Sequence, residues 1–186
     1  MRYRIIILIL IIASCKSETK VSNEINASVS NMWSNYINSH PDFKNNEVPE
    51  SWYFHDNKYD ADRLADLTLS GKKQAASGLY AWYKNANANL PIVGKKHIIT
   101  DFNGHAQAII EIVKVDTIPF NKITIEYAEL DMGTQIEPLK QWKKAHREFF
   151  TSTLDKTNDK PLEDMLVVCE WFKKIWPVQN SQKLYD

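Results

Sequence analysis

The segment from Ala106 to Val115 constrains the fold most strongly, because apolar residues occupy both alternating faces of a predicted β-strand. They flank one acidic residue, Glu111, and are Ile109, Ile110, Ile112 and Val113. A strand with two apolar faces has to be covered on both sides, as in a closed barrel surrounded by helices. His97–Thr100 is the predicted partner strand, and residues 101–104 form the hairpin turn between the two.

The other predicted elements are short and of both kinds. Strands are expected at Lys72–Tyr80 and Leu166–Ile175. Helices are expected at Asn31–Ser39, from a cap at Asp60 to a turn at Gly71, at Ala81–Asn89, at Thr124–Leu130, and where Leu139, Trp142, His146, Phe149 and Phe150 repeat at helical spacing. This mixture favours an α+β fold, a small mixed β-barrel with flanking helices, over a doubly wound sheet.

The first residues have the order of a secretory signal. Arg2 and Arg4 precede the apolar run Ile5–Ile12, which is shorter than the roughly 20 residues that a membrane-spanning helix needs. The tetrapeptide Ile12-Ala13-Ser14-Cys15 resembles a bacterial lipobox, which implies cleavage before Cys15 and lipidation of its thiol. We therefore expect an extracytoplasmic lipoprotein of the cell envelope, anchored in a membrane. The alternative is a chance cysteine after an ordinary secretory signal.

The chain divides into five predicted segments. These are the signal peptide (1–14), a polar tether (15–30), an N-terminal helix and connector (31–51), one folded domain (52–176) and a C-terminal tail (177–186). If Cys15 carries lipid, Cys169 is the only other cysteine, so no intrachain disulfide is expected. The apolar neighbours of Cys169 indicate a small buried hydrophobic residue.

Composition excludes several classes of function. The chain has 23 basic and 23 acidic residues, and loss of Arg2 and Arg4 leaves 21 against 23, a net charge of −2. Such a chain lacks the basic surface for tight DNA duplex binding. The five glycines form no dinucleotide-binding or phosphate-loop motif. His97, His105 and Asp101 lack a convincing further ligand, so we predict neither a metal nor another cofactor.

Several motifs, in order, resemble the ASCH domain over about Trp52 to Trp176. They are Ala61–Leu67, Gly71-Lys72-Lys73, Leu90–Gly94, Asp101 with Gly104, Ile118-Pro119-Phe120 with Ile123-Thr124, and Leu139-x-x-Trp142-x-x-x-His146 with Phe149-Phe150. The resemblance implies a PUA-like fold with a cleft suited to nucleobases or RNA. Some members of that family are amidohydrolases of acylated cytidine, and others have been assigned ribonuclease activity.

The chain departs from the amidohydrolase pattern, in which a Gly-x-Lys-x-x-Thr stretch and a separate glutamate form the site. Gly71 and Lys73 fit that stretch, but Ala76 stands in place of the threonine. Strand alternation is expected to point the Ser77 hydroxyl away from the pocket of Lys73. The acidic run that many members carry before the Trp and His helix is also missing, and residues 132–136 stand there.

Candidate site residues follow from these motifs. Lys73, Glu129 and Asp131 are the candidates for catalysis. Lys73, Trp142, Lys143 and His146 are the candidates for ligand binding, with Trp142 either stacked on a base or in the core and His146 either a cleft wall or a buried histidine. Lys72 is expected on the solvent side of its turn. Alanine at position 73 is expected to weaken ligand binding and to leave the melting temperature nearly unchanged.

Three functions remain open at this point. The first is a lipid-anchored domain, with or without surviving catalysis, that binds a nucleoside, nucleotide or short single-stranded RNA. The second is a hydrolase, either an amidohydrolase of N4-acylated cytidine or a ribonuclease, in which Lys73 and a carboxylate activate water. The third is a tethered protein-interaction module that keeps only the fold.

Overall fold

The computed structural model describes residues 17–154 and 162–178. Its helices are α1 (Ser17–Ser39), α2 (Lys58–Leu69), α3 (Tyr80–Asn85), α4 (Ile125–Met132) and α5 (Pro138–Thr153). Its strands are β1 (Ser51–Trp52), β2 (Ala75–Leu79), β3 (Lys96–Thr100), β4 (Ala106–Pro119) and β5 (Leu166–Trp176). Short 3-10 turns lie at Pro41–Phe43, Phe120–Lys122 and Leu162–Asp164. Cys15 lies outside the described residues.

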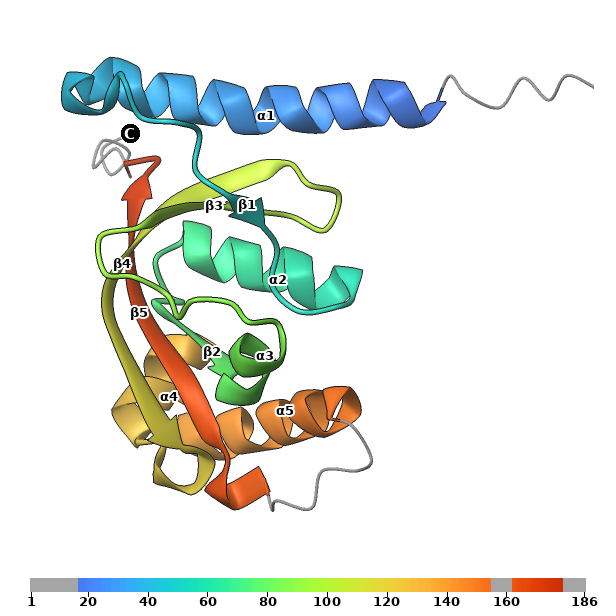
Figure 1. Cartoon of the computed structure of the whole chain (residues 1–186), viewed down its shortest axis with the longest axis vertical. Helices are drawn as coiled ribbons and strands as arrows, with labels where there is room; N and C mark the ends of the chain where they lie inside the picture. Colours follow the sequence, from blue (N-terminus) through green and yellow to red (C-terminus); the bar gives the residue numbers. More distant parts are fainter. Residues whose placement is uncertain (1–16, 155–161, 179–186) are drawn as a thin grey trace, which may run out of the picture.

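One mixed sheet organises the chain, and it confirms the predicted α+β class. Its strand order is β1-β3-β4-β5-β2, with β1 parallel to β3 and the other neighbours antiparallel. The two long strands, β4 and β5, are strongly curved, and the register between them shifts where Ile112 and Lys114 pair with successive residues of β5 (Figure 1). Val113 lies in this bulge and is exposed, although Ile112 beside it is buried.

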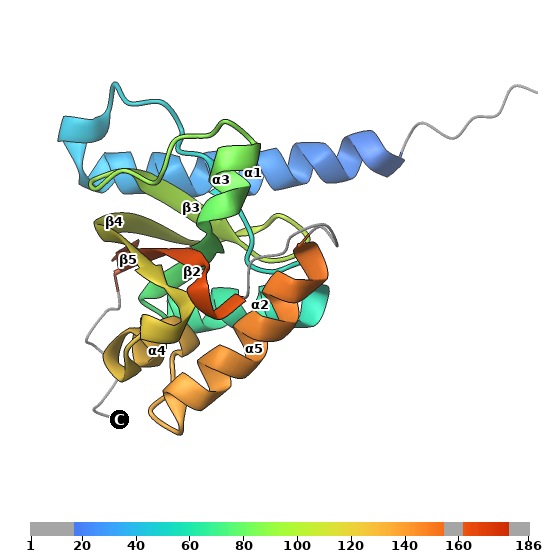
Figure 2. The same ribbon diagram turned by 60° about the horizontal axis from the view of Figure 1, so that its bottom comes forward.

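Both faces of β4 are covered, as its sequence predicts. Ile109 packs in a cluster with residues of α1, whereas Ile110 packs on the opposite face with Ala65 of α2 and with Phe54. Figure 1 shows α1 at one end of the molecule and α4 with α5 at the other, with the curved sheet between them. Turning the molecule brings α5 forward, where it crosses in front of part of α2 (Figure 2).

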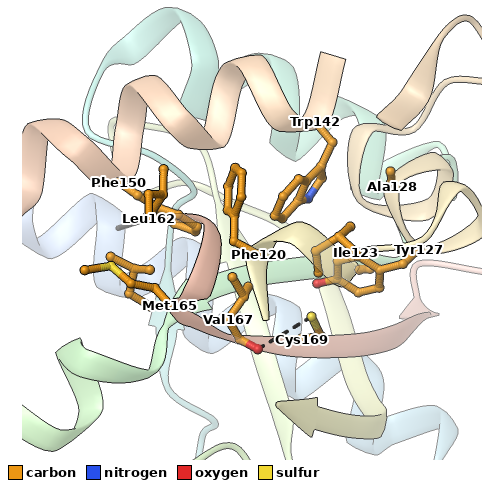
Figure 3. Packing of buried hydrophobic residues seen from close by; sticks show 12 residues of the cluster. Phe120, Ile123, Tyr127, Ala128, Trp142, Phe150, Leu162, Met165, Val167 and Cys169 are labelled. Carbon is orange, nitrogen blue, oxygen red and sulfur yellow. Dashed lines mark hydrogen bonds between the residues drawn. The ribbon is translucent and has the colours of Figure 1, made fainter. Parts of the chain in front are cut away.

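The largest core lies between the sheet and the pair α4 and α5. Phe120, Trp142 and Phe150 are each at most 1% exposed and fill its centre (Figure 3). Cys169 of β5 is fully buried in the same cluster, and burial raises its pKa to about 12. Cys169 is therefore the small buried hydrophobic residue that the sequence predicts.

Helix α1 is longer than predicted and is part of the fold. It begins at Ser17, within the segment predicted as a polar tether. Val29 is buried with Trp33 and Tyr36, and Ser28 Oγ accepts a hydrogen bond of 2.9 Å from the backbone N–H of Ala106. The prediction of a polar tether over residues 15–30 is therefore wrong at its C-terminal end, where residues 28 and 29 belong to a helix that packs on the sheet. No helix within the described residues has the length and apolarity needed to cross a bilayer.

Candidate functional site

A turn between α2 and β2 places Lys73 beside the end of α4. Gly71 adopts a φ of +74°, and the backbone N–H groups of Lys72 and Lys73 then both donate to the carbonyl of Leu67, at 2.9 and 3.0 Å. Gly133, also left-handed, passes so close that an added Cβ would lie 3.3 Å from the backbone of both lysines. The two turns are packed together, and this contact fixes the position of Lys73.

Lys73 and Asp131 form a buried ion pair. Their side chains are 4% and 2% exposed, and Lys73 Nζ donates both to the Asp131 carboxylate and to the Asp131 carbonyl, the latter at 2.7 Å. Burial acts to raise the pKa of Asp131, but Lys73, His146 and the Ser77 hydroxyl together outweigh it, so that the pKa lies below its ordinary value. The ammonium also lies 4.9 Å from the ring centroid of Phe54. Lys72, by contrast, is exposed.

Ser77 joins this pair, and the expectation that its hydroxyl points away is wrong. Ser77 Oγ donates to Asp131 Oδ2 at 2.5 Å and lies 2.8 Å from the hydroxyl of Tyr127. The expectation assumed that the pocket of Lys73 lies on the face of β2 that carries Ala76, whereas the Asp131 carboxylate that Lys73 binds lies within reach of the Ser77 hydroxyl.

Trp142 and His146 of α5 complete the surroundings of Asp131. Trp142 is fully buried and its indole N–H donates to Asp131 Oδ2 at 2.8 Å, so its place is in the core and it has no open ring face. His146 stacks on it with ring centroids 4.1 Å apart, and His146 Nε2 lies 3.4 Å from the same oxygen. Burial lowers the pKa of His146, despite the nearby carboxylate.

A cleft of about 1050 Å³ opens beside this cluster. Lys73, Ser77, Asp131 and His146 lie in its wall, so the structure brings together three of the predicted site residues and one that was discounted. Aromatic rings form much of the remaining wall: Trp52, Tyr53, Phe54, Trp82, Tyr83 and Phe149. Phe149 lies 5.7 Å from Trp82 and stacks against His55 at 4.5 Å.

Besides the buried Trp142, two predicted candidates do not line this cleft. Glu129 accepts a hydrogen bond of 2.7 Å from Gln135, and Lys143 lies beside a separate shallow depression formed with Ile125 and Pro138. Both follow from the geometry of a helix. Glu129 is two positions from Asp131 and Lys143 is two positions from Ala145, which both line the cleft, and residues two apart on a helix point to different sides. Asp131 is thus the carboxylate that α4 presents to the cleft.

Glu170 of β5 is a site residue that sequence reasoning missed. It lines the cleft, and the hydroxyl of Tyr83 donates to Glu170 Oε1 at 3.3 Å. Burial raises the pKa of this carboxyl group to about 7. The signal in the sequence is an acidic residue within the apolar run from Val167 to Phe172. Burying a carboxyl group in such a strand costs free energy unless it is hydrogen-bonded, so an acidic residue there marks a candidate site residue.

A second polar group lies at the β1 end of the cleft. Trp52 donates its indole N–H to Nδ1 of His97 at 3.2 Å, and burial lowers the pKa of His97. His105 is instead exposed and lies 3.2 Å from Asp101. In residues 17–154 and 162–178, no three His, Cys, Asp or Glu side chains are grouped to hold a metal ion.

Comparison with known proteins identifies the fold. The crystal structure of an ASCH domain from Lactobacillus crispatus JV V101 matches with a TM-score of 0.72 and 29% identity, covering 80% of this chain and 94% of that one. A protein from Enterococcus faecalis V583 matches with a TM-score of 0.70 and 30% identity, covering 80% and 88%. No curated protein matches. The family model of the ASCH domain matches residues 50–176, and the chain therefore belongs to the ASCH domain family.

Proposed function

We propose that the protein binds one nucleobase, as a nucleoside, a nucleotide or the end of a short single-stranded RNA, in the cleft beside Lys73. The observation that supports this most strongly is the composition of the cleft wall, where aromatic rings surround a buried polar cluster. Flat bases stack on aromatic side chains, and a few fixed polar groups then recognise their edges. The volume of about 1050 Å³ accommodates a nucleotide.

The charges at the cleft favour a small or single-stranded ligand over a duplex. Arg63 and Lys95 lie in its wall together with the acidic residues Glu50, Asp56 and Asp60. Such a mixed rim gives no continuous basic surface along which a duplex phosphate backbone could lie. Asp131 already neutralises the Lys73 ammonium, so Lys73 would contact a ligand mainly as a hydrogen-bond donor and adds little net positive charge to the cleft.

A hydrolase is the second candidate, and the Ser77–Asp131–Lys73 contact favours it. In an acyl transfer, Ser77 Oγ would attack the carbonyl carbon, Asp131 would take the hydroxyl proton, and the Lys73 ammonium would stabilise the oxyanion. The lowered pKa of Asp131 makes it a weak base, however, whereas an efficient general base has a pKa near the working pH. Binding is therefore the primary proposal.

Replacing Phe149 with alanine tests the binding function. The variant removes a ring from the cleft wall, and loss of one base-stacking contact is expected to weaken binding by about tenfold. Binding of the common ribonucleosides, their monophosphates and a short single-stranded RNA is measured by fluorescence, because Trp52 and Trp82 lie in the cleft wall and report on occupancy.

Phe102→Ala is the matched control, because this partly buried phenylalanine contacts Tyr53 but does not line the cleft. It is expected to leave the affinities unchanged. Equal losses in both variants contradict binding in the cleft, and no binding by the folded native protein favours the interaction module. The same mixtures are analysed for product, and turnover that Ser77→Ala abolishes would favour the hydrolase instead.

We also propose that Cys15 carries lipid and holds the protein at a membrane of the cell envelope. The proposal rests on the lipobox-like tetrapeptide that follows the apolar leader. Fatty-acid labelling in a bacterial host is expected to mark the native chain and the Cys169→Ala variant, and to miss Cys15→Ala. Equal labelling of the native chain and Cys15→Ala, or of neither, contradicts lipidation.

A further inference from the structure

Glu170 projects from the centre of the sheet into the cleft. On β5 it pairs with Ala76 of β2 on one side and with Val115 of β4 on the other. Directly paired residues point to the same face of a sheet, and both neighbours are too short to cover a carboxyl group. Glu170 and Ala76 both line the cleft. The carboxyl group is therefore open to a ligand, although its sides are packed by protein.

The contacts of Glu170 distinguish its two oxygens. The Tyr83 hydroxyl donates to Oε1, and Oε2 has no hydrogen-bond partner among residues 17–154 and 162–178. A hydroxyl donor favours the carbonyl oxygen of a neutral carboxyl group, so the proton of the neutral form belongs on Oε2. In this form the group presents a donor next to an acceptor, on a residue that lines the cleft.

The charged and titratable groups around Glu170 come from four other elements. They are Tyr83 of α3, Asp131 of α4, Lys73 before β2 and Lys95 before β3. Burial is the largest effect and raises the pKa to about 7, Asp131 acts in the same direction, and Tyr83 and the two lysines oppose it. The partners on β2 and β4 carry no titratable group. The carboxyl group is thus mostly neutral below about pH 7.

We propose that neutral Glu170 reads the pairing edge of the bound base and selects bases in which a ring-nitrogen acceptor lies beside an amino group, as in adenine and cytosine. This inference rests on the proposed nucleobase-binding function and adds the ligand class and the residue that determines it. The Oε2–H group donates to the ring nitrogen, and Oε1 accepts from the amino group. Two parallel hydrogen bonds of this kind discriminate between edges.

Ionisation of Glu170 removes this recognition, because a carboxylate has two acceptors and repels the ring nitrogen of adenine. Guanine, a purine of similar size, has two adjacent donors, its N1–H and amino groups, and a carboxylate accepts a hydrogen bond from each. Adenosine and guanosine are therefore a matched pair of probes. They lack a phosphate, which would itself titrate in the relevant pH range.

The test is the dissociation constant of adenosine and guanosine, measured by fluorescence from about pH 5.5 to about pH 8.5. With a pKa of about 7, the neutral fraction falls enough to raise the adenosine Kd about 30-fold across this range. The guanosine Kd is expected to fall over the same range, because ionised Glu170 accepts hydrogen bonds from both guanine donors. Cytidine is expected to follow adenosine, because its edge has the same donor and acceptor order.

Three variants separate recognition from structure. Glu170→Gln has a donor beside an acceptor at every pH, so its adenosine Kd is expected to be flat and close to the low-pH value of the native protein. Tyr83→Phe removes a hydrogen bond that lowers the pKa of Glu170, so the midpoint of the adenosine profile is expected to move to higher pH. Glu126→Gln, an exposed change in the first turn of α4, is expected to keep the native profile.

A flat adenosine profile in the native protein, or a Glu170→Gln profile equal to the native one, overturns the inference while nucleoside binding stands. Binding of uridine alone does the same. If the native protein, shown to be folded by circular dichroism, binds no nucleoside at any pH, both the inference and the proposed function are overturned. These outcomes are distinguishable in a single set of titrations.

Discussion

Replacing Lys73 with alanine is expected to lower the free energy of unfolding by about 3 to 5 kcal/mol, because the Asp131 carboxylate is then buried without its cation. Asp131 keeps hydrogen bonds from Ser77 and Trp142, which support a negative charge but do not neutralise it. Urea unfolding at pH 7, followed by circular dichroism, measures the loss. The burial of this pair reverses the expectation from sequence that the melting temperature stays nearly unchanged.

Lys72→Ala is the matched control, since the neighbouring lysine is exposed and should change stability by no more than about 0.5 kcal/mol. A double variant, Lys73→Met with Asp131→Leu, removes both charges and is expected to recover part of the loss. Equal small effects of Lys72→Ala and Lys73→Ala would show that the pair is not buried in solution.

The free energy of unfolding of Glu170→Gln is expected to increase relative to that of the native chain as the pH rises. The pKa of Glu170 is about 7 in the folded protein, against an ordinary value of 4.5 in the unfolded chain, so the folded state binds more protons between these values. Its contribution to stability is present below about pH 4.5 and is lost as the pH rises through about 7. The stability difference between variant and native chain should change by about 2 to 3 kcal/mol over this range.

Urea unfolding of both chains from about pH 4 to about pH 8 measures this difference. Subtracting the two free energies of unfolding removes the pH effects of the other groups, which both chains share. Glu126→Gln, an exposed change of the same chemistry, should show no such trend. A constant difference between Glu170→Gln and the native chain would mean that Glu170 titrates normally and that its carboxyl group is well solvated.

Local pattern was sufficient to predict much of the fold. The apolar run of β4, the hairpin with β3 and the turn at Gly71 all lie where the sequence places them, because each depends on neighbouring residues. The boundaries that differ have a tertiary cause. β4 extends to Pro119 because β5 pairs with it from Ile109 to Pro119. Helix α2 is capped by Asn57, whose side chain accepts a hydrogen bond from the backbone N–H of Asp60.

The site was less predictable, because its parts come from distant segments. Lys73 and Asp131 were chosen separately, and no spacing in the sequence indicates that they form a pair across 58 positions. The Ser77 hydroxyl was expected to point away because the pocket was assumed to lie on the Ala76 face of the strand, and only the position of Asp131 on α4 shows that Ser77 reaches the cluster. Glu170 was overlooked because its strand resembles a core strand, and only the packing of α3 against that strand gives its carboxyl group a partner in Tyr83.

The docking of α1 on the sheet determines how the cleft would be presented at a surface. The helix begins two residues after Cys15 and continues into contacts with β4 through Ser28 and Val29. Its 23 residues form a rod about 34 Å long, at roughly 1.5 Å per residue, whereas a flexible chain of that length would let the domain tumble. A lipid on Cys15 would therefore be separated from the domain by a rod of set length instead of a flexible chain. The cleft would then meet its ligands at a nearly constant distance from the point of attachment.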